Sequence, residues 1–155
     1  MDIDDTDRRI VNALLDDGRA SARDIAAETG VAATTVSKRL DELEASGVVA
    51  GYTATVDYEE LGYDITAIFH LGVDGDGLAS VVERLRGHDR MVGVYEVTGS
   101  HDIVAVGKFT DTDEMNAEIK TLLTDEHVKA ANTSVVLNTV REFETFAVDT
   151  EDEEN

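Results

Sequence analysis

Apolar positions in the first 45 residues repeat at helical spacing and predict three short helices. The apolar stripe of the first helix consists of Ile10, Val11, Leu14 and Leu15. Asp4, followed by Asp7 three residues later, has the spacing of an N-terminal capping box, and Gly18 ends the helix. We expect this helix to brace the two that follow it.

The stretch from 21 to 43 predicts the other two helices, joined by a tight turn. Ser21 and Asp24 repeat the capping spacing, and Gly30 stands where the chain must turn sharply. The apolar stripe of the later helix consists of Val36, Leu40 and Leu43. Its other face carries short hydroxyls and cations, the groups that hydrogen-bond to phosphates and base edges. These residues are Thr34, Thr35, Ser37, Lys38 and Arg39.

The spacing of Ala26, Gly30 and Val36 is that of a helix-turn-helix. The small residue lets the two helices approach, the glycine makes the turn, and the valine packs the second helix on the first. An ordinary helical hairpin with a solvated polar face has the same pattern. DNA binding and a purely structural hairpin therefore both stay open at this point.

After Gly47 the pattern becomes β-rich. Val48, Val49 and residues 52–56 predict either a small wing or a strand that leads out of the first domain. The pattern changes again near 58–62. We therefore expect a first domain at 1–60.

Residues 61–146 have the order strand, helix, strand, strand, helix, strand. The predicted strands are 65–73, 91–98, 103–109 and 133–140. The helices are marked by the apolar stripes Leu78, Val81, Val82, Leu85 and Met115, Ile119, Leu122, Leu123. This order predicts an α+β chain whose second domain is ferredoxin-like, with both helices on one face of an antiparallel sheet.

The strands of this domain are apolar on both faces. In the second strand, Val92 and Val94 are expected on one face, and Met91, Tyr95 and Val97 on the other. One face meets the helices, so the other predicts contact with another subunit. The final residues, 147–155, are acidic and are expected to form a disordered tail.

The charge complicates a DNA-binding interpretation. The 155 residues have a net charge of −21, of which 1–60 contribute −8 (6 basic, 14 acidic) and the remainder −13 (7 basic, 20 acidic). In dilute salt such a protein repels DNA. The even spread, rich in Asp and poor in Lys, resembles proteins of halophilic archaea, where molar salt screens charge over a few Å. The alternative is an acidic protein whose partner is not nucleic acid.

Several other function classes lack their signatures. Without cysteine there are no disulfides or thiolate metal sites, and a reducing cytoplasm is the simplest compartment. No apolar run approaches the roughly 20 residues of a membrane span, and the polar N-terminus is not a signal peptide. Asp111, Asp113 and Glu114 suit a helix start rather than catalysis. The histidines share no ligand spacing, so we expect no metal, cofactor or catalytic residue. They are His70, His88, His101 and His127.

Three stretches together resemble the Lrp/AsnC family of feast/famine regulators. They are IDDTDRRIVNALLDDGRAS, IAAETGVAATTVSKRLDELEASGVVAGYTATVDYEELGY and VTGSHDIVAVGKF. The resemblance covers the chain to about Glu142. It implies transcriptional regulation through the helix-turn-helix, a homodimer built through the sheets that often assembles into octamers, and an amino acid or related effector bound between the second domains.

By position, the resemblance assigns the five polar residues from Thr34 to Arg39 to the recognition helix. It assigns Gly99, Ser100, His101 and Asp102 to the effector-binding turn. Asp102 is expected to accept from a ligand amino group, or alternatively to cap local N–H groups of the turn. Ala32 departs from the family, which usually has Ser there, and the lost helix cap costs about 1 kcal/mol.

A dimer of this kind presents two recognition helices to successive major grooves, so its DNA sites are expected to be roughly palindromic. Two alternatives remain. A siroheme-decarboxylase-like enzyme needs His or Arg donors in the central strands, and MVGVYEVT offers neither. An amino-acid sensor without DNA binding is favoured by Ala32, Ala33 and the acidic first domain, whereas Lys38 and Arg39 argue against it.

Overall fold

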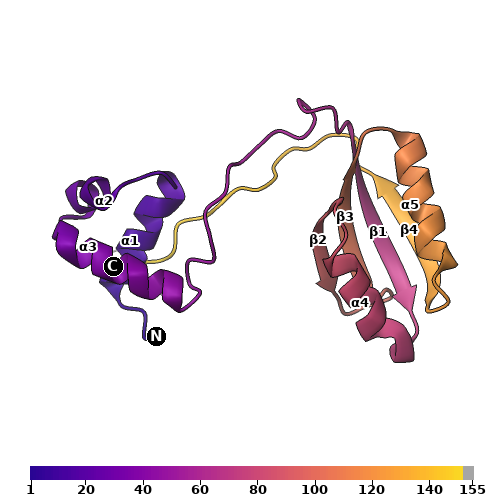
Figure 1. The fold of residues 1–155 in the computed structure, drawn as a ribbon, viewed down its shortest axis with the longest axis horizontal. Coiled ribbons are helices and arrows are strands. Elements are labelled where there is room, and N and C mark those ends of the chain that lie inside the picture. Colours follow the sequence, from indigo (N-terminus) through magenta and orange to yellow (C-terminus); the bar gives the residue numbers. More distant parts are fainter. Residues whose placement is uncertain (152–155) are drawn as a thin grey trace. The chain divides into compact units, whose positions relative to one another are not determined.

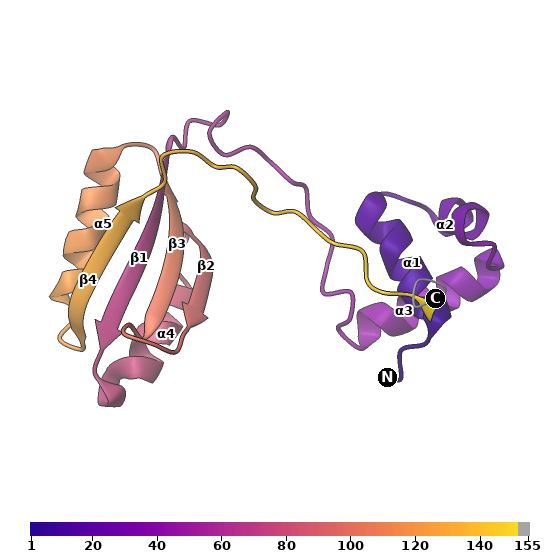
Figure 2. The same ribbon diagram turned by 180° about the vertical axis from the view of Figure 1, so that it is seen from behind.

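The structure, a computed structural model, describes residues 1–151 and divides the chain into two compact units. The first unit combines residues 1–55 with the C-terminal stretch from Arg141 onward, and the second unit comprises 56–140. Both ends of the chain therefore belong to the same unit. Figures 1 and 2 show the elements of each unit from opposite sides.

The first unit is a bundle of three helices, as the apolar spacing predicted. They are α1 (Asp5–Asp16), α2 (Ala22–Thr29) and α3 (Ala33–Ala45). Their core is small, and its fully buried apolar side chains are at most 2% exposed. These are Ile10, Ala13, Ile25, Val36 and Leu43.

The helix ends of this unit confirm the local signals in the sequence. The Asp7 N–H donates to Asp4 Oδ1 at 2.9 Å, and the Asp4 N–H donates back to Asp7 Oδ2 at 3.1 Å. Ser21 and Asp24 form the same reciprocal pair before α2. The Ser21 N–H that donates to the Asp24 carboxylate lowers the pKa of that group. Gly30 turns the chain with φ of 74°, a conformation that a residue without Cβ adopts easily.

The second unit is a four-stranded antiparallel sheet in the order β2-β3-β1-β4, with both helices on one face (Figures 1 and 2). Its elements are β1 (Ile65–Val73), the short helix η1 (Gly75–Gly77), α4 (Leu78–Arg86), β2 (Met91–Glu96), β3 (Ile103–Phe109), α5 (Thr112–Thr124) and β4 (Val128–Val135). This is the predicted ferredoxin-like arrangement. Asp111 caps α5 by accepting from the Glu114 N–H, which confirms its expected role.

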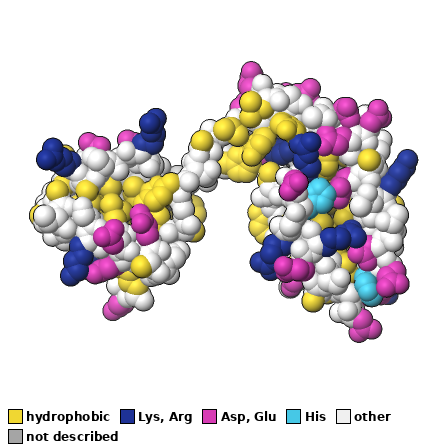
Figure 3. Space-filling model, viewed as in Figure 1, with side chains coloured by type: hydrophobic (Ala, Val, Ile, Leu, Met, Phe, Trp, Pro, Cys, Tyr) yellow, Lys and Arg dark blue, Asp and Glu magenta, His cyan; other side chains and the backbone are white. Residues whose placement is uncertain are grey.

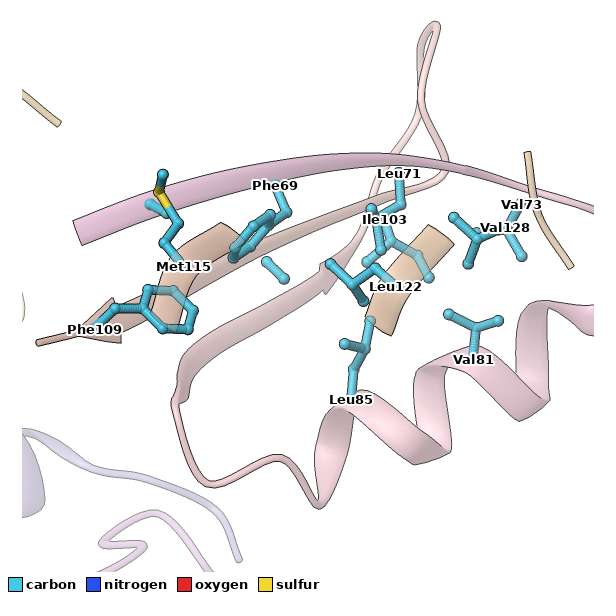
Figure 4. Packing of buried hydrophobic residues seen from close by; sticks show 12 residues of the cluster. Phe69, Leu71, Val73, Val81, Leu85, Ile103, Phe109, Met115, Leu122 and Val128 are labelled. Atoms are coloured by element: carbon cyan, nitrogen blue, oxygen red, sulfur yellow. The ribbon is translucent and has the colours of Figure 1, made fainter. Parts of the chain in front are cut away.

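The core of this unit lies between the sheet and the two helices (Figure 4). Phe69 of β1 and Phe109 of β3 meet edge to face, with ring centroids 5.9 Å apart. Val81 and Leu85 of α4 pack against this layer from the helical side. The sheet face away from the helices has no such cover within the second unit.

The last strand differs from the prediction. It covers Val128–Val135, about five residues earlier than the expected 133–140. The register decides this, because β4 pairs with β1 from Val73↔Val128 to Ala67↔Val135. The β-branched run around Val136 fits a strand better by composition than the earlier Ala and Asn residues do, but pairing with a central strand outweighs that preference.

The second strand contains a bulge that reverses part of the predicted facing. Its register shifts between Met91 and Gly93, so one extra residue is inserted. Met91 and Val94 both pack on the core side, whereas Val92 and Tyr95 remain 40% and 58% exposed. The expected split, with Val92 and Val94 on one face, is therefore wrong.

Two further segments depart from expectation. Val48, Val49 and residues 52–56, expected to form a wing or linking strand, are neither helix nor paired strand in the described chain. The tail expected to be disordered from 147 is hydrogen-bonded to α1 as far as Glu151. The rest of that predicted tail, 152–155, lies outside the described residues.

Candidate nucleic-acid interface and effector turn

The outward face of α3 carries four of the five polar residues predicted to contact DNA. Val36 and Leu43, on the opposite face of the helix, are completely buried. Thr34, Thr35, Ser37 and Lys38 are all exposed. The Lys38 side chain is 77% exposed, and it forms an ion pair with Glu42 one turn later, at 4.0 Å. The α3 surface therefore presents three hydroxyls and an accessible cation to a partner.

Arg39, the fifth predicted residue, lies on a different side of α3. Its Nη1 is 3.1 Å from Asp4 Oδ2 and 3.3 Å from both carboxylate oxygens of Asp7. Asp7 is fully buried, and the Arg39 side chain is only 31% exposed. The guanidinium of Arg39 thus links α3 to the start of α1.

The same contacts explain the electrostatics at the start of α1. The Asp7 N–H, followed by the nearby Arg39 charge, favours the ionised form of Asp4 and lowers its pKa. The N-terminal end of a helix also favours negative charge. Asp4, Asp7 and Arg39 therefore form a charged joint between the first and third helices.

The third helix, α3, begins without a side-chain cap. Ala32 is extended, with φ of −59° and ψ of 138°, and provides no cap hydrogen bond. The first two helices both have capping boxes, so α3 is the helix of this unit with an unassisted start. This agrees with the expected consequence of alanine at position 32.

Basic side chains do not dominate the visible surface of the first unit. On the face in Figure 3 they stand singly among acidic ones rather than in one patch. Residues 1–55 carry 6 basic and 11 acidic side chains, so any attraction for phosphate has to be local rather than spread over the unit.

The predicted effector residues form the turn between β2 and β3. Gly99 has φ of 111°, a conformation that favours glycine. The Asp102 N–H donates to the Leu71 carbonyl at 2.9 Å, and its Oδ2 accepts from the Val73 N–H at 2.8 Å. Asp102 thereby binds the turn to β1, and the N–H that its carboxylate accepts from belongs to that strand rather than to the turn itself.

The turn is joined by two residues that sequence patterns did not single out as ligands. His101 Nε2 lies 3.0 Å from Asn132 Nδ2, and the His101 and His70 rings are 5.3 Å apart. His70 and Asn132 are direct partners in the β1–β4 register. Ser100 Oγ is 3.3 Å from the other nitrogen of His101. The result is a polar cluster at one end of the open sheet face.

Two features of the described residues bear on membrane proteins and metal-binding proteins, whose signatures the sequence lacks. Among residues 1–151, no helix is long and apolar enough to cross a membrane. The same residues contain no group of three or more His, Asp or Glu side chains placed to hold a metal ion.

The two units match two family models. A model described as winged helix-turn-helix DNA-binding matches residues 3–50, and one described as the Lrp/AsnC ligand binding domain matches residues 66–146. The chain belongs to the Lrp/AsnC family of transcriptional regulators. The resemblance expected from the sequence is thereby confirmed.

Relatives of this regulator extend over nearly its whole length. An uncharacterized HTH-type transcriptional regulator of Pyrococcus furiosus is 40% identical over 143 residues, covering 92% of this chain and 96% of the relative. The HTH-type transcriptional regulator FL11 of Pyrococcus abyssi is 33% identical, with 92% and 94% covered. These relatives are named as regulators and not as enzymes, in agreement with the absence of a predicted catalytic residue.

Solved structures show the same fold. AsnC of E. coli has a TM-score of 0.86 at 23% identity, covering 96% of this regulator and all of that chain. A transcriptional regulator of Neisseria meningitidis, solved as a complex with L-Met, has a TM-score of 0.86 at 22% identity, covering 96% and 97%.

The polar residues of the regulator differ in how far local sequence patterns predict their positions. Helical periodicity placed Arg39 beside Lys38 on the polar side, but the buried carboxylate of Asp7 draws it towards α1. The capping box with Asp4 already accounts for Asp7, so no local signal pointed to a further partner 32 residues away. His70 and Asn132 had no local signal, since only strand pairing brings them together.

Proposed function

We propose that this regulator binds double-stranded DNA sequence-specifically through the exposed face of α3. The observation that carries the proposal is that Thr34, Thr35, Ser37 and Lys38 are exposed on a helix whose other side is fixed by the bundle core. In a helix-turn-helix such a face enters the major groove. The hydroxyls suit phosphate and base-edge contacts, and Lys38 suits a phosphate or guanine.

Arg39 has a positioning role in this proposal. Its bonds to Asp4 and Asp7 fix the rotation of α3 relative to α1, and therefore the direction in which Lys38 points. Loss of Arg39 is therefore expected to weaken DNA binding because α3 is no longer held in its orientation on α1, and not because Arg39 itself contacts DNA.

The regulator is further proposed to act as a homodimer, which can assemble further, at roughly palindromic sites. The open sheet face supports this, because Tyr95 is 58% exposed and Val92 40% exposed there. Leu137 and Val140, just beyond β4, are 98% and 89% exposed. A second copy is the partner that the family's symmetric assembly provides. Analytical ultracentrifugation of wild type and Tyr95→Glu tests this, with a shift to monomer expected for the variant.

An amino acid or a related small molecule is the proposed effector, bound at the turn from Gly99 to Asp102. The match to the Lrp/AsnC ligand binding domain supports this, and so does the L-Met complex of the Neisseria regulator. Asp102 shapes the turn, and Ser100 and His101 provide the neighbouring polar atoms. Thermal shifts with single amino acids test the proposal: a ligand at 100 times its Kd adds about 2.7 kcal/mol, and His101→Ala should reduce the shift.

High salt is the proposed working condition, in the cytoplasm that holds the chromosome. The net charge of −21 means that close approach to DNA requires screening. The regulator has few Lys and Arg side chains that could neutralise phosphates and release the counterions of the DNA. The logarithm of Kd should therefore change less steeply with log[KCl] than for a basic repressor. Melting should move upward as KCl rises, and a constant melting temperature would contradict the salt-adapted interpretation.

Fluorescence anisotropy with the DNA upstream of the regulator's own gene tests DNA binding. Wild type is compared with Lys38→Ala and with the matched control Lys120→Ala, which removes an exposed lysine from the second unit. We expect about a tenfold loss for Lys38→Ala and little change for the control, as for one good phosphate or base contact. Equal binding of random DNA by all three proteins would favour the alternative of a sensor without specific DNA binding.

A further inference from the structure

The C-terminal strap, defined here as residues 148–151, lies along α1 of the DNA-binding unit. Asn12 Nδ2 donates to the Val148 carbonyl at 2.9 Å, and the Val148 N–H donates to Asn12 Oδ1 at 2.8 Å. Arg8 donates to the Asp149 carbonyl, and the Glu151 N–H donates to Asp5 Oδ1 at 2.9 Å. Figures 1 and 2 show the strap, at the yellow end of the chain, ending beside α1.

The docking strip on α1 is a single helical face that the core does not use. Asp5, Arg8 and Asn12 are three and four residues apart, which places them on one side of the helix. The buried side contains Ile10 and Ala13 instead. The strip is therefore a surface that recognises an extended chain.

Recognition uses only the backbone of the strap. Asn12 presents a donor and an acceptor to one residue, as a neighbouring β-strand would. The side chains of Asp149 and Glu151 take no part in these four bonds, and both residues are exposed. Docking thus holds the strap in place and leaves its carboxylates facing solvent.

The strap and the residues around it change the charge of the DNA-binding unit considerably. Residues 1–55 have 6 basic and 11 acidic side chains, a net charge of −5. The C-terminal stretch 141–155, which belongs to the same unit, has 1 basic and 7 acidic side chains, a net charge of −6. More than half of the unit's net negative charge, −6 of −11, thus comes from a segment that is not part of the three-helix bundle.

We propose that the C-terminal strap is an autoinhibitory element that docks on α1 and weakens DNA binding by its own helix-turn-helix. The proposal rests on the DNA binding proposed above. The α1 helix is only about 18 Å long, so charges on it lie within about two Debye lengths of the rest of the unit at 0.1 M salt. Repulsion from the phosphates should therefore be large in dilute salt and small at molar salt, where the Debye length is about 3 Å.

Hydrogen exchange tests the docking without DNA. The amides of Val148 and Glu151 should be protected in the full-length protein, since both donate to α1 side chains. Asn12→Ala should remove the protection of Val148, and Asn12→Asp, which keeps an acceptor, should retain part of it. Rapid exchange of both amides in the wild type would overturn the docking.

DNA affinity tests the inhibition. A labelled 30-base-pair duplex is titrated at about 0.2 M and 2 M KCl with wild type, a chain that ends at Ala147, and full-length Asp149→Asn/Glu151→Gln. The matched control is Asp113→Asn/Glu126→Gln, which removes two exposed carboxylates from the second unit. At about 0.2 M KCl we expect the shortened chain to bind about tenfold more tightly than the wild type, and the double variant about threefold more tightly. The control should bind like the wild type. At about 2 M KCl all four proteins should bind with similar affinity.

The outcomes separate the two proposals. If neither the wild type nor the shortened chain binds any duplex, the proposed DNA binding fails. If the wild type binds and removal of the strap or its charges leaves the affinity unchanged, the inhibition is overturned while DNA binding stands. An equal gain in the control shows a general charge effect and also overturns the role of the strap. The double variant keeps the test valid if the shortened chain melts too early to assay.

Discussion

The two units of this regulator differ in where the interactions that define them come from. Much of the structure of the DNA-binding unit follows from local sequence signals. Its capping boxes join residues three positions apart, and its helices pack around a small core. The effector unit depends on cross-strand pairing and leaves one sheet face uncovered, with Tyr95 58% exposed. The first unit is therefore nearly complete within one chain, whereas the second leaves an apolar sheet face that we propose a second copy covers.

The largest expected effect comes from emptying the effector core. Phe69→Ala removes a fully buried ring that meets Phe109 and should destabilise the effector unit by about 3–5 kcal/mol. Hydrogen exchange followed unit by unit measures this, with Ile25 in α2 reporting on the other unit. If the amides of both units lose protection together, the two units unfold as one, and the contrast between them is wrong.

Arg39→Ala is expected to have the next largest effect, now in the DNA-binding unit. It leaves the carboxylate of Asp7 buried without its cation, which should cost about 2–4 kcal/mol, below the upper range because Arg39 is 31% exposed. Thermal melting of Arg39→Ala, with Lys38→Ala as the exposed control, measures the difference. Adding Asp7→Asn to Arg39→Ala should recover part of the loss, and equal melting of the two single variants would contradict a positioning role.

A glycine of the effector unit tests its packing more gently. A Cβ at Gly77 would lie 2.0 Å from the ring of His127, which precedes β4. Gly77→Ala should therefore cost about 1–3 kcal/mol by overpacking. Gly75→Ala, where a Cβ meets nothing within 4 Å, is the matched control. Equal stability of the two variants would show that the contact relaxes without cost.

The same contrast explains how far the sequence alone predicts this molecule. Both capping boxes, the Gly30 turn and the exposed face of α3 were predictable, because each signal spans only a few residues. The position of β4 was not, because its register is set by β1, some 60 residues earlier in the chain. The bulge at Gly93 likewise depends on the neighbouring strand, and it reverses which side chains face the core.

The candidate sites divide in the same way. The four exposed residues of α3 followed from helical periodicity, whereas the pairing of Arg39 with Asp7 joins residues 32 positions apart. His101 and Asn132 are 31 positions apart, and the docking of the strap is much longer-range, because the Asn12–Val148 bonds span 136 positions. No local pattern contains that information, and a strongly acidic C-terminus by itself predicts a disordered tail.

The smallest predicted effect improves the one helix start of the DNA-binding unit that lacks a capping side chain. Ala32 is already in the extended conformation of an N-cap residue, so a hydroxyl there can accept from the N–H of Thr34 or Thr35 without rearrangement. Ala32→Ser should stabilise this unit by about 1 kcal/mol, or roughly 4–8 °C for a unit of this size. Ala27→Ser, at an exposed position inside α2, is the control and should cost a few tenths of a kcal/mol. Hydrogen exchange in α4 and α5 should be unchanged by either variant, because both substitutions lie in the DNA-binding unit and these helices belong to the effector unit. If Ala32→Ser stabilises nothing, the start of α3 is already satisfied by solvent, and the two capping boxes matter less to this unit than their geometry indicates.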